Sequence, residues 1–541
     1  MRRYLLLAFP FLALVLAQSC GSSSPGSGFT DPDSGQSSGS SGGGDGAACS
    51  SPRRTCNGVC IDVTTDPQNC GNCGSTCDTG AQCCGGVCVT TAACDFSVTK
   101  VDTFRLYLSG SQWVTIHGAG FAPGMKVLIG DGRAPARVID DKTALLLTPP
   151  GLAGSADLSV EVNGKTATLK QAFQYIDAGL ATPWQQKPMS IVRGEDPGIA
   201  VMQDGRVLIA GGTEVPDDPA ALPDGGVNHA LDTAEIYTRQ TDVVTPVAST
   251  MSAPRWHDSA ITLLSGKVLV VGATCPATPC DSAKNADLFD PTTNTFTPTK
   301  GSLTNIRTYT RSVLLPDGRV LVASASDPTL EVYDPATDAF TEIGQTPVVH
   351  TFGFMVRLRD GRALIGGGDG TVTDAEIFDP ETNAVTPTGP LQQGRSMLTA
   401  HTLPDGRVLV IGGASISAGG IDVPLDSIEA FDPKAGTFST MPYKLSIGRT
   451  WHASALVRDG TVLVMGGYTI DKQCNSLTDS VDQIQPLANK VAPFANLPNA
   501  NTEWTAVTLL DGSVLGVGGG ACGTATALPD LDFLPGAPET K

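Results

Sequence analysis

Residues 394–413 read GRSMLTAHTLPDGRVLVIGG, and residues 427–442 read SIEAFDPKAGTFSTMP. The same pattern returns at 306–325, IRTYTRSVLLPDGRVLVASA, and at 329–344, TLEVYDPATDAFTEIG. Each unit has an arginine-led apolar stretch, an Asp-Gly pair, a Val/Leu-rich stretch, a stretch ending in aromatic-Asp-Pro, and a last short stretch with an aromatic residue. The Asp-Gly pair favours a type I′ hairpin turn, because that turn needs positive φ at both central residues. One unit therefore predicts four short strands.

The unit recurs seven times between residues 180 and 536. Its Gly-Gly position, where neighbouring backbones can approach closely, falls at 211, 272, 324 (as Ser-Ala), 367, 412, 466 and 518. The mean spacing is about 51 residues, and a four-stranded repeat of about 50 residues is similar to the kelch repeat. The resemblance implies an all-β chain with a seven-bladed kelch-like β-propeller at 180–536. A six-bladed ring with an irregular tail is the alternative.

Two features predict how the units join. The seventh copy holds only three strands, at Trp504–Leu510, Ser513–Val517 and Asp530–Leu534. We therefore expect Thr182–Lys187, just before the first copy, to supply the missing outer strand and to join the ends of the ring. The aromatic residue of the third strand is expected to pack between blades; it is found at Tyr237, Phe289, Tyr333, Phe378 and Phe431.

The N-terminus has the pattern of a signal peptide over residues 1–19. Met1-Arg2-Arg3 is basic, and Tyr4–Ala17 is apolar but too short to span a bilayer as a mature helix. Leu16-Ala17-Gln18-Ser19-Cys20 resembles the lipobox of bacterial lipoproteins, which implies lipidation of Cys20. That family usually has Leu where this chain has Ala17, so plain secretion is the alternative. Gly21, by the family's sorting rule, implies anchorage to the outer membrane, facing the periplasm or the cell surface.

Composition agrees with export. The chain has 15 cysteines, which are typical of an oxidising compartment, and a formal net charge of −19. A chain this acidic repels nucleic acid and anionic lipid, so we expect no nucleic-acid partner and a membrane contact only through the lipid anchor. Residues 20–47 are rich in Gly and Ser and predict a flexible tether.

Residues 48–96 predict a small disulfide-rich module. The segment has little else to form a core, so its even number of cysteines predicts five disulfides of undetermined pairing. Zinc held by Cys70 and Cys73 is the alternative. The stretch CNGVCIDVTTDPQNCGNCGSTC at 56–77 resembles the module of stigma-specific-protein-like sequences, which implies a secreted structural or interaction module. The ten cysteines are Cys49, Cys56, Cys60, Cys70, Cys73, Cys77, Cys83, Cys84, Cys88 and Cys94.

Residues 100–177 predict a β-sandwich, because short apolar-polar alternations such as VTIHGAGF (114–121) and LSVEVNG (158–164) recur between turns. The segment is similar to IPT/TIG domains, which are immunoglobulin-like, and this implies spacing or binding rather than chemistry. Four cysteines remain in the predicted propeller. Their loop positions predict the pairs Cys275–Cys280 and Cys474–Cys522.

Kelch propellers include copper radical oxidases such as galactose oxidase, a family that needs a Tyr-His pair, a second histidine and a Tyr cross-linked to Cys. RTWHASALVRDGTVLVMGG at 449–467 and NTEWTAVTLLDGSVLGVGGG at 501–520 resemble its ligand segments. The ligand positions read Trp451-His452 and Trp504-Thr505, and neither tryptophan nor threonine replaces tyrosinate or imidazole. His257 shares the repeat position of His452, which favours a structural role. We predict no catalytic residue, metal or other cofactor.

The repeat also predicts a binding face. Arginine precedes the inner strand at Arg255, Arg307, Arg395 and Arg449, with His350 and Asn501 at the same position elsewhere. One interpretation is that these arginines ring the channel mouth and bind an acidic glycan or peptide. The alternative, which we favour, is that they brace neighbouring loops. Long loops at 213–233, 274–285, 414–427, 468–480 and 520–530 lie on the same side. The first is acidic (Glu214, Asp217, Asp218, Asp224), and calcium there is an alternative to plain solubility.

These observations predict a non-enzymatic cell-envelope lipoprotein for surface display or adhesion, which binds extracellular protein or glycan through the loop-rich propeller face. The first alternative is an extracellular carbohydrate-active or copper-radical-type oxidase with atypical ligands. The second is a structural envelope spacer.

Overall fold

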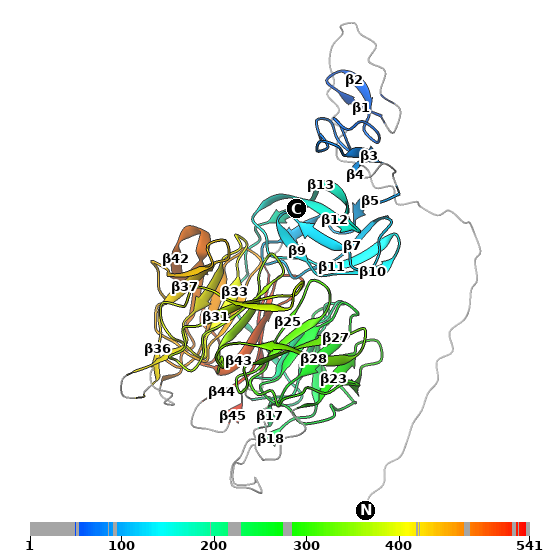
Figure 1. Ribbon diagram of the computed structural model, residues 1–541. Coiled ribbons are helices and arrows are strands. Elements are labelled where there is room, and N and C mark those ends of the chain that lie inside the picture. The colour runs from blue at the N-terminus through cyan, green and yellow to red at the C-terminus, as the bar shows by residue number, and fades with distance from the viewer. Residues whose placement is uncertain are drawn as a thin grey trace, which may run out of the picture. The chain divides into compact units, whose positions relative to one another are not determined.

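The computed structural model describes residues 49, 53–84, 86–89, 95–194, 196–214, 229–273, 284–417, 420, 422–469, 476–521, 526–527 and 530–536. Residues Cys49–Lys541 make up one compact unit. Strands dominate its described part, which also contains the 3₁₀ turn η4 (Pro486–Ala488) (Figure 1). Among the described residues, no helix has the length and apolar character needed to cross a membrane.

Several predictions concern residues outside the described ranges. These are the signal peptide at 1–19, the lipidated Cys20, the tether at 20–47, Cys94, the pairs Cys275–Cys280 and Cys474–Cys522, and the loop carboxylates Asp217, Asp218 and Asp224.

The disulfide-rich module is a pair of small hairpins held by cystines. Strands β1 (Arg53–Cys56) and β2 (Val59–Asp62) form one hairpin, and β3 (Gln82–Cys84) and β4 (Val87–Val89) form the other. Four disulfides join Cys49 to Cys60, Cys56 to Cys73, Cys70 to Cys83 and Cys77 to Cys88. Cys84 is disulfide-bonded as well.

The zinc alternative for the module is therefore wrong. Cys70 and Cys73 belong to two different disulfides, so neither sulfur is available as a thiolate ligand. The buried core of the module is made of Cys70, Cys77, Cys83 and Cys88, with Ala81 packed against them. Cystine thus replaces the apolar side chains that so short a segment lacks.

The following sandwich packs two sheets around an apolar core. One sheet has the order β10 (Ala136–Asp140), β11 (Thr143–Leu147), β7 (Trp113–Ala119), β5 (Ser97–Val101). The other contains β13 (Lys165–Ile176), β12 (Gly154–Val162), β8 (Lys126–Ile129) and β9 (Gly132–Ala134), and β6 (Arg105–Tyr107) runs parallel to β13. Alternate residues such as Val114, Ile116, Leu158 and Val160 are buried between the sheets, as period-2 patterning requires.

The sequence-predicted boundary at 96–100 does not separate two independent sheets. Strand β4 of the disulfide module pairs with β13 of the sandwich, so one sheet contains strands from both segments. The pairing joins Val89 to Ala167 and Cys88 to Thr168. The periodicity of each segment gave no sign of this pairing, because it involves an edge strand whose partner lies far along the chain.

The described part of residues 180–536, here called the seven-sheet region, contains seven separate antiparallel sheets of four main strands each. It also contains two short two-stranded sheets, β17 (Thr213–Glu214) with β18 (His229–Ala230) and β35 (Ala414–Ile416) with β36 (Asp422–Pro424). Sheet 1 is β15 (Gly198–Val201), β16 (Val207–Ala210), β19 (Ala234–Thr238) and β20 (Val243–Pro246); sheet 2 is β21 (Ser259–Thr262), β22 (Val268–Val271), β23 (Ala286–Asp290) and β24 (Thr295–Pro298). Sheet 3 is β25 (Arg311–Leu314), β26 (Val320–Ala323), β27 (Thr329–Asp334) and β28 (Ala339–Gln345); sheet 4 is β29 (Phe354–Arg357), β30 (Ala363–Gly366), β31 (Ala375–Asp379) and β32 (Ala384–Pro387). Sheet 5 is β33 (Thr399–Thr402), β34 (Val408–Ile411), β37 (Ile428–Asp432) and β38 (Thr437–Thr440); sheet 6 is β39 (Ala453–Leu456), β40 (Val462–Met465), β41 (Val481–Gln485) and β42 (Lys490–Pro493).

Sheet 7 contains β43 (Thr502–Thr508), β44 (Val514–Ala521), β46 (Asp530–Leu534) and β14 (Gln185–Pro188). Strand β14 pairs with β46 from Gln185 opposite Phe533 to Pro188 opposite Asp530. This confirms the expectation that a segment before the first repeat completes the seventh, although the strand begins three residues later than Thr182.

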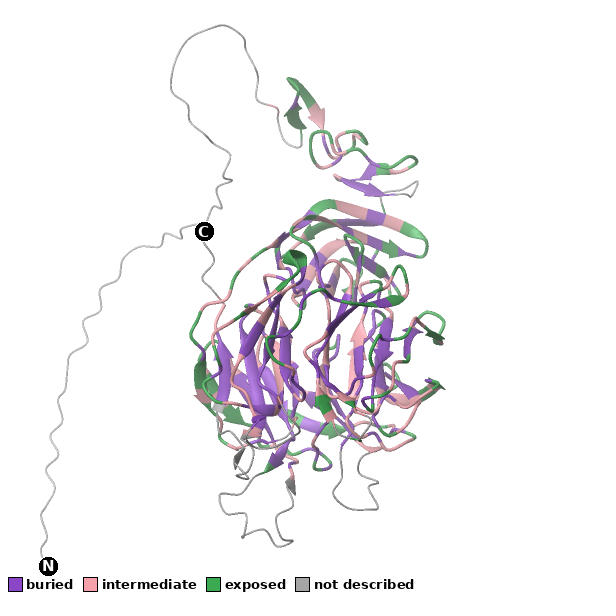
Figure 2. Cartoon of the chain, turned by 90° about the vertical axis from the view of Figure 1, so that its left-hand side faces the viewer, coloured by how far each residue is buried: buried purple, intermediate pink, exposed green. Residues whose placement is uncertain are grey.

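The sheets meet face to face, and their second strands are buried on both sides. Strands β16, β22, β34 and β40 are buried at every residue, as unbroken Val/Leu/Ile stretches between two packed faces require (Figure 2, purple). Seven apolar clusters lie between successive sheets, including one that joins sheet 7 to sheet 1 through Tyr237 and Phe533. The third-strand aromatics are buried in these clusters, which confirms their predicted packing; they are Tyr237, Phe289, Tyr333, Phe378 and Phe431.

The first hairpin of each repeat differs from the predicted type I′ turn. In sheet 5 the Gly406 N–H donates to the carbonyl of Leu403, and the Leu403 N–H donates to Arg407. Gly406 has φ 92°, but Asp405 is not among the residues with positive φ. This is a type I turn followed by a glycine bulge, and it is favoured because Pro404 presets the φ of the first turn position.

Candidate functional site

The predicted binding arginines lie inside the seven-sheet region. Arg255, Arg307, Arg395 and Arg449 have no exposed surface. Each guanidinium contacts a carboxylate on the third strand of its own sheet. The Arg395 Nη2 lies 2.6 Å from Glu429 Oε1, and its Nη1 donates to the carbonyls of Gly412 and Ser427. These positions correct the expectation of an exposed arginine ring; the arginines brace the loops, as the alternative held.

Other repeats fill the same position differently. Arg193, which is one residue out of register in the sequence, contacts Glu235 at 3.1 Å. His350 lies 2.7 Å from Glu376 through Nε2 and 2.7 Å from the Gly367 carbonyl through Nδ1. Asn501 donates to the carbonyl of Gly518.

Sequence reasoning missed the acidic partners. Five of the six precede the third-strand aromatic by two residues, as in Ala-Glu-Ile-Tyr at 234–237 and Ala-Glu-Ile-Phe at 375–378, and Asp482 precedes Ile484 in the same way. A single acid among apolar strand residues is the signal that could have found them, because an unpaired carboxylate does not remain in such a strand. They are Glu235, Asp287, Glu331, Glu376, Glu429 and Asp482, all buried.

The entry to the first strands carries a ring of backbone outliers, here called the mouth residues. Each sheet contributes one non-glycine residue with φ between 33° and 54°, which costs about 1–3 kcal/mol per residue and is typical of functional sites. Backbone hydrogen bonds join neighbours around the ring, for example Trp451 N–H to Met397 O at 3.2 Å and Glu503 N–H to Trp451 O at 3.1 Å. The mouth residues are Asp196, His257, Tyr309, Phe352, Met397, Trp451 and Glu503. The predicted shared repeat position of His257 and His452 is therefore wrong, because His257 corresponds to Trp451 and His452 follows one residue later.

Aromatic side chains cluster on one half of this ring. The His257 ring stacks on Tyr309 with centroids 4.0 Å apart, and Tyr309 meets Phe352 edge to face at 4.3 Å. Trp451 lies 5.4 Å from Phe352, and Trp256 lies 6.1 Å from His257. Tyr309, Phe352, Trp451 and Trp256 are all half-buried. The cluster is therefore a partly exposed aromatic surface rather than a closed core.

Charged groups complete the ring. Asp196 and Glu503 are half-buried and adjacent, since the Asp196 N–H donates to the Glu503 carbonyl at 3.0 Å. Burial raises the pKa of Asp196, and nearby Arg311 offsets part of that rise. Burial also holds the pKa of His257 at about 3, so its imidazole is neutral at physiological pH. Below the ring is a cavity of about 320 Å³, whose lining includes Asp196, Arg311 and Trp451.

The residues at this mouth do not fit copper. His452 is buried, and its Nε2 lies 3.0 Å from Thr399 Oγ1. His401 Nε2 lies 2.6 Å from Ser454 Oγ, deeper among the first strands. In the described ranges, the one group of three or more His, Cys, Asp or Glu close enough to share an ion is Cys70, Cys77 and Cys88, which are disulfide-bonded. Trp451 stands where the copper oxidase resemblance calls for tyrosinate.

The sandwich and the disulfide-rich module each match a known protein family. Residues 97–175 match the IPT/TIG domain family, and residues 44–100 match the stigma-specific STIG1-like protein family. The sandwich is an IPT/TIG domain. No curated protein sequence matches the chain.

Two solved structures resemble the chain at low identity. One is a fungal alcohol oxidase of the AA5 family in complex with copper, with a TM-score of 0.52 and 16% identity over 66% of this chain and 77% of that one. The other is described as the structure of YjhT, with a TM-score of 0.42 and 14% identity over 57% of this chain and 99% of that one. At 16% identity, the similarity to the alcohol oxidase shows a shared fold only. The residues at the mouth, described above, give no reason to infer copper chemistry from that similarity.

Proposed function

We propose that the seven-sheet region is a seven-bladed kelch-like propeller. Three observations support this. The first strands of neighbouring sheets contact each other in cyclic order, including β15 with β43. The apolar clusters run between every pair of successive sheets. Strand β14 joins the start of the region to its end.

We further propose that the chain is a non-enzymatic binding protein of the cell envelope, and that its ligand is an extracellular glycan or protein held at the mouth residues. The observation that carries this proposal is the half-buried aromatic cluster of Tyr309, Phe352 and Trp451. Flat aromatic surfaces beside polar groups are typical of binding sites, because they give contact area at low entropic cost.

The same ring favours a neutral or amine-bearing glycan over an acidic one. Aromatic faces suit the apolar face of a sugar ring, and the carboxylates of Asp196 and Glu503 accept hydrogen bonds from hydroxyl or ammonium groups. The buried arginines that suggested an acidic ligand already have carboxylate partners of their own. Surface display or adhesion is the role that this chemistry supports.

Export and anchorage remain part of the proposal. Four cystines in residues 49–88 agree with an oxidising compartment. The lipobox-like segment ending at Cys20 and the Gly/Ser-rich residues 20–47 would then hold the folded part away from the outer membrane. Palmitate labelling of the full chain and of Cys20→Ala tests the anchor, and unchanged labelling of the variant would contradict it.

The test of binding uses glycan and peptide arrays with the wild-type chain, Tyr309→Ala and Trp451→Ala. We expect at least tenfold weaker binding of any captured glycan by both variants. Phe104→Ala, which removes an exposed aromatic from the sandwich, is the matched control and should bind as wild type does. A captured ligand that is insensitive to Tyr309 and Trp451 would place the site elsewhere.

Metal analysis separates this reading from the oxidase alternative. We expect no stoichiometric copper in the purified chain and no peroxide release on sugars or alcohols. One equivalent of bound copper together with peroxide release would favour the oxidase alternative over the binding proposal. Folded protein that captures nothing on either array would leave the structural spacer as the better account.

A further inference from the structure

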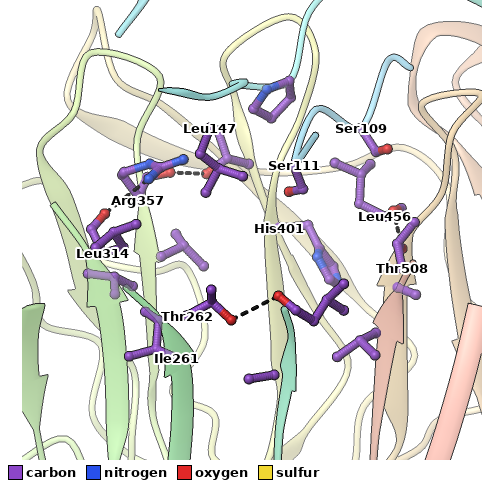
Figure 3. Close-up of a pocket in the computed structure, with 18 of the residues that line it drawn as sticks. Ser109, Ser111, Leu147, Ile261, Thr262, Leu314, Arg357, His401, Leu456 and Thr508 are labelled. Atoms are coloured by element: carbon purple, nitrogen blue, oxygen red, sulfur yellow. Dashed lines mark hydrogen bonds between the residues drawn. The ribbon is translucent and has the colours of Figure 1, made fainter. Parts of the chain in front are cut away.

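A second cavity lies at the other end of the first strands, away from the mouth residues. Its volume is about 470 Å³, and every one of the seven first strands contributes to its wall. The sandwich covers it with Ser109, Ser111, Leu147 and Pro149 (Figure 3). A space of this size, mostly apolar and with a few polar groups, has the dimensions of a small-molecule site.

The wall of this cavity is positively charged within a chain of net charge −19. Its lining includes Arg357 and Arg359 and contains no Asp or Glu, while His401, also in the lining, is neutral because burial holds its pKa at about 4. Arg359 contacts Asp131 of the sandwich. Arg357 has no carboxylate within ion-pair distance among the described residues, and its one side-chain hydrogen bond runs from Nη1 to the Leu314 carbonyl at 3.0 Å.

Arg357, which is half-buried, differs from the five fully buried arginines of the same region. Arg193, Arg255, Arg307, Arg395 and Arg449 each lie 2.6–3.1 Å from a carboxylate of the same sheet. Burial lowers the pKa of Arg357 to about 10, with no charged group to offset it. The guanidinium is still protonated at neutral pH and the residue is half-buried, so a partly desolvated cation faces the cavity without a counter-ion, and an anion that joins it would offset the desolvation cost.

The equivalent positions in other sheets show that the fold does not require a positive charge at residue 357. Arg357 ends its first strand, and the matching residues in three other sheets are Thr262, Thr402 and Thr508. Each threonine hydroxyl donates to the carbonyl of the residue that ends the preceding first strand, at 2.7–2.8 Å. The Arg357 Nη1 makes the same bond to Leu314. A hydroxyl is enough for this bond, so the rest of the guanidinium is free for another partner.

We propose that this cavity binds a small organic anion with an apolar body, and that Arg357 holds its anionic head. Ile261, Leu314 and Leu456 give the apolar wall around the same space (Figure 3). The planar guanidinium fork fits a carboxylate, sulfate or phosphate group. None of the mouth residues lines this cavity, although it shares first-strand residues such as Ile199, Ala400 and Ser454 with the cavity below the mouth.

The experiment titrates the intact mature chain with octanoate, octyl sulfate and octyl phosphate, all below micellar concentration, by calorimetry. Octan-1-ol is the uncharged reference. We expect at least one of the three anions to bind, and Arg357→Thr to weaken it at least tenfold while octan-1-ol binding stays within twofold. The three anions distinguish which head group the fork accepts.

Arg357→Thr restores the residue of the other repeats, so it should fold with an unchanged melting temperature in the absence of ligand. Arg362→Gln, on the exposed hairpin beside sheet 4, is the control for loss of one positive charge and should bind as wild type does. Ala400→Leu, which fills the cavity from its wall, should abolish anion binding with Arg357 intact. Failure of all three anions to bind, or equal binding by Arg357→Thr, would overturn the proposal.

Discussion

The arginines of the seven-sheet region have different roles: five stabilise the fold, and one is assigned to a ligand. Five arginines with carboxylate partners lie at one repeat position, and they tie the loop before each first strand to the third strand. Their function is to hold the mouth residues, which stand two or three positions further on, in a backbone conformation of positive φ. Arg357, without such a partner, is the arginine available to a ligand.

Removal of one such arginine should destabilise the fold strongly. Arg395→Ala leaves Glu429 as an uncompensated buried carboxylate, so we expect a loss of about 3–5 kcal/mol in the free energy of unfolding. Arg362→Ala, which removes an exposed arginine paired with Asp360, should cost at most about 1 kcal/mol. Urea denaturation followed by tryptophan fluorescence measures both. Similar losses in the two variants would mean that the buried pair is not a structural tie.

The buried histidines predict acid sensitivity. Burial holds the pKa of His401 at about 4, below its unfolded value of about 6.5. The unfolded chain therefore binds a proton that the folded chain does not, so the contribution of His401 to stability is complete above pH 6.5 and is lost as pH falls toward 4. Asp258, whose pKa burial raises to about 7, acts in the opposite direction.

His401→Gln isolates this histidine, because the amide can still bond to Ser454 and does not titrate. Between pH 6.5 and 5 the wild type should lose at most about 2 kcal/mol more than the variant. Denaturation curves at pH 7.5, 6.5, 5.5 and 5 give the difference, and the Asp258 contribution cancels between the two proteins. Parallel pH profiles would show that His401 is protonated in the folded chain as readily as in the unfolded one.

At the scale of elements, much of the strand pattern is readable from the sequence. Stretches such as VLVI (408–411) and VLVM (462–465) are buried on both faces, and the Asp-Gly pairs mark the hairpins that follow the first strands. The turn type was not readable from Asp-Gly alone, because only the glycine takes positive φ, both in repeats with a proline before the aspartate and in repeats without one, such as that of Gly205. The inward orientation of the arginines was equally hidden, since it depends on an acid some 30 residues away that periodicity treats as an ordinary strand residue.

The mouth residues show where sequence reasoning stops. Trp451 and Phe352 are bulky residues with φ of 54°, a conformation that propensity assigns to glycine or asparagine. They adopt it because hydrogen bonds from neighbouring sheets and the buried ties beside them determine the backbone. A pattern confined to one repeat contains no information about the next sheet in the ring.

Strand β14 allows a test of whether the start and the end of the seven-sheet region are held together by this strand. Replacing Gln185–Pro188 with Gly-Ser-Gly-Ser should free the outer edge of β46, lower the melting temperature and speed amide hydrogen exchange in Asp530–Leu534. The same replacement of β20 (Val243–Pro246) removes an outer strand that joins no chain ends. Its effect should stay local to sheet 1. Equal effects of the two replacements would show that β14 is an ordinary edge strand rather than the closure.

At the scale of the whole molecule, the sandwich and the seven-sheet region meet through hairpin turns. The Leu108 N–H donates to Arg458 O at 3.0 Å, and the Arg133 N–H donates to Arg359 O at 2.7 Å. Arg458 also donates to the carbonyls of Ala178 and Gly179, where the chain passes from one part to the other. The sandwich thereby closes the cavity that contains Arg357, so the stability of this contact decides whether that cavity exists.

Arg359 should be the residue on which this contact depends. Its guanidinium bonds to Asp131 of the sandwich and to the Pro404 carbonyl of sheet 5, and it is largely buried. Asp131 is mostly exposed and Glu381, which pairs with Lys126 and Arg133 of the sandwich at 2.8 Å, is about half exposed, so water screens both attractions. Arg359 differs because its largely buried guanidinium also packs against Gly132 of the sandwich. We expect wild-type protein and Glu381→Gln to unfold with the sandwich and the seven-sheet region coupled in one calorimetric transition. Arg359→Ala should separate it into two, with the sandwich melting first and exchange rising at Ser109–Trp113. A single transition in Arg359→Ala would assign the coupling to the backbone bonds of Leu108 and Arg133 instead.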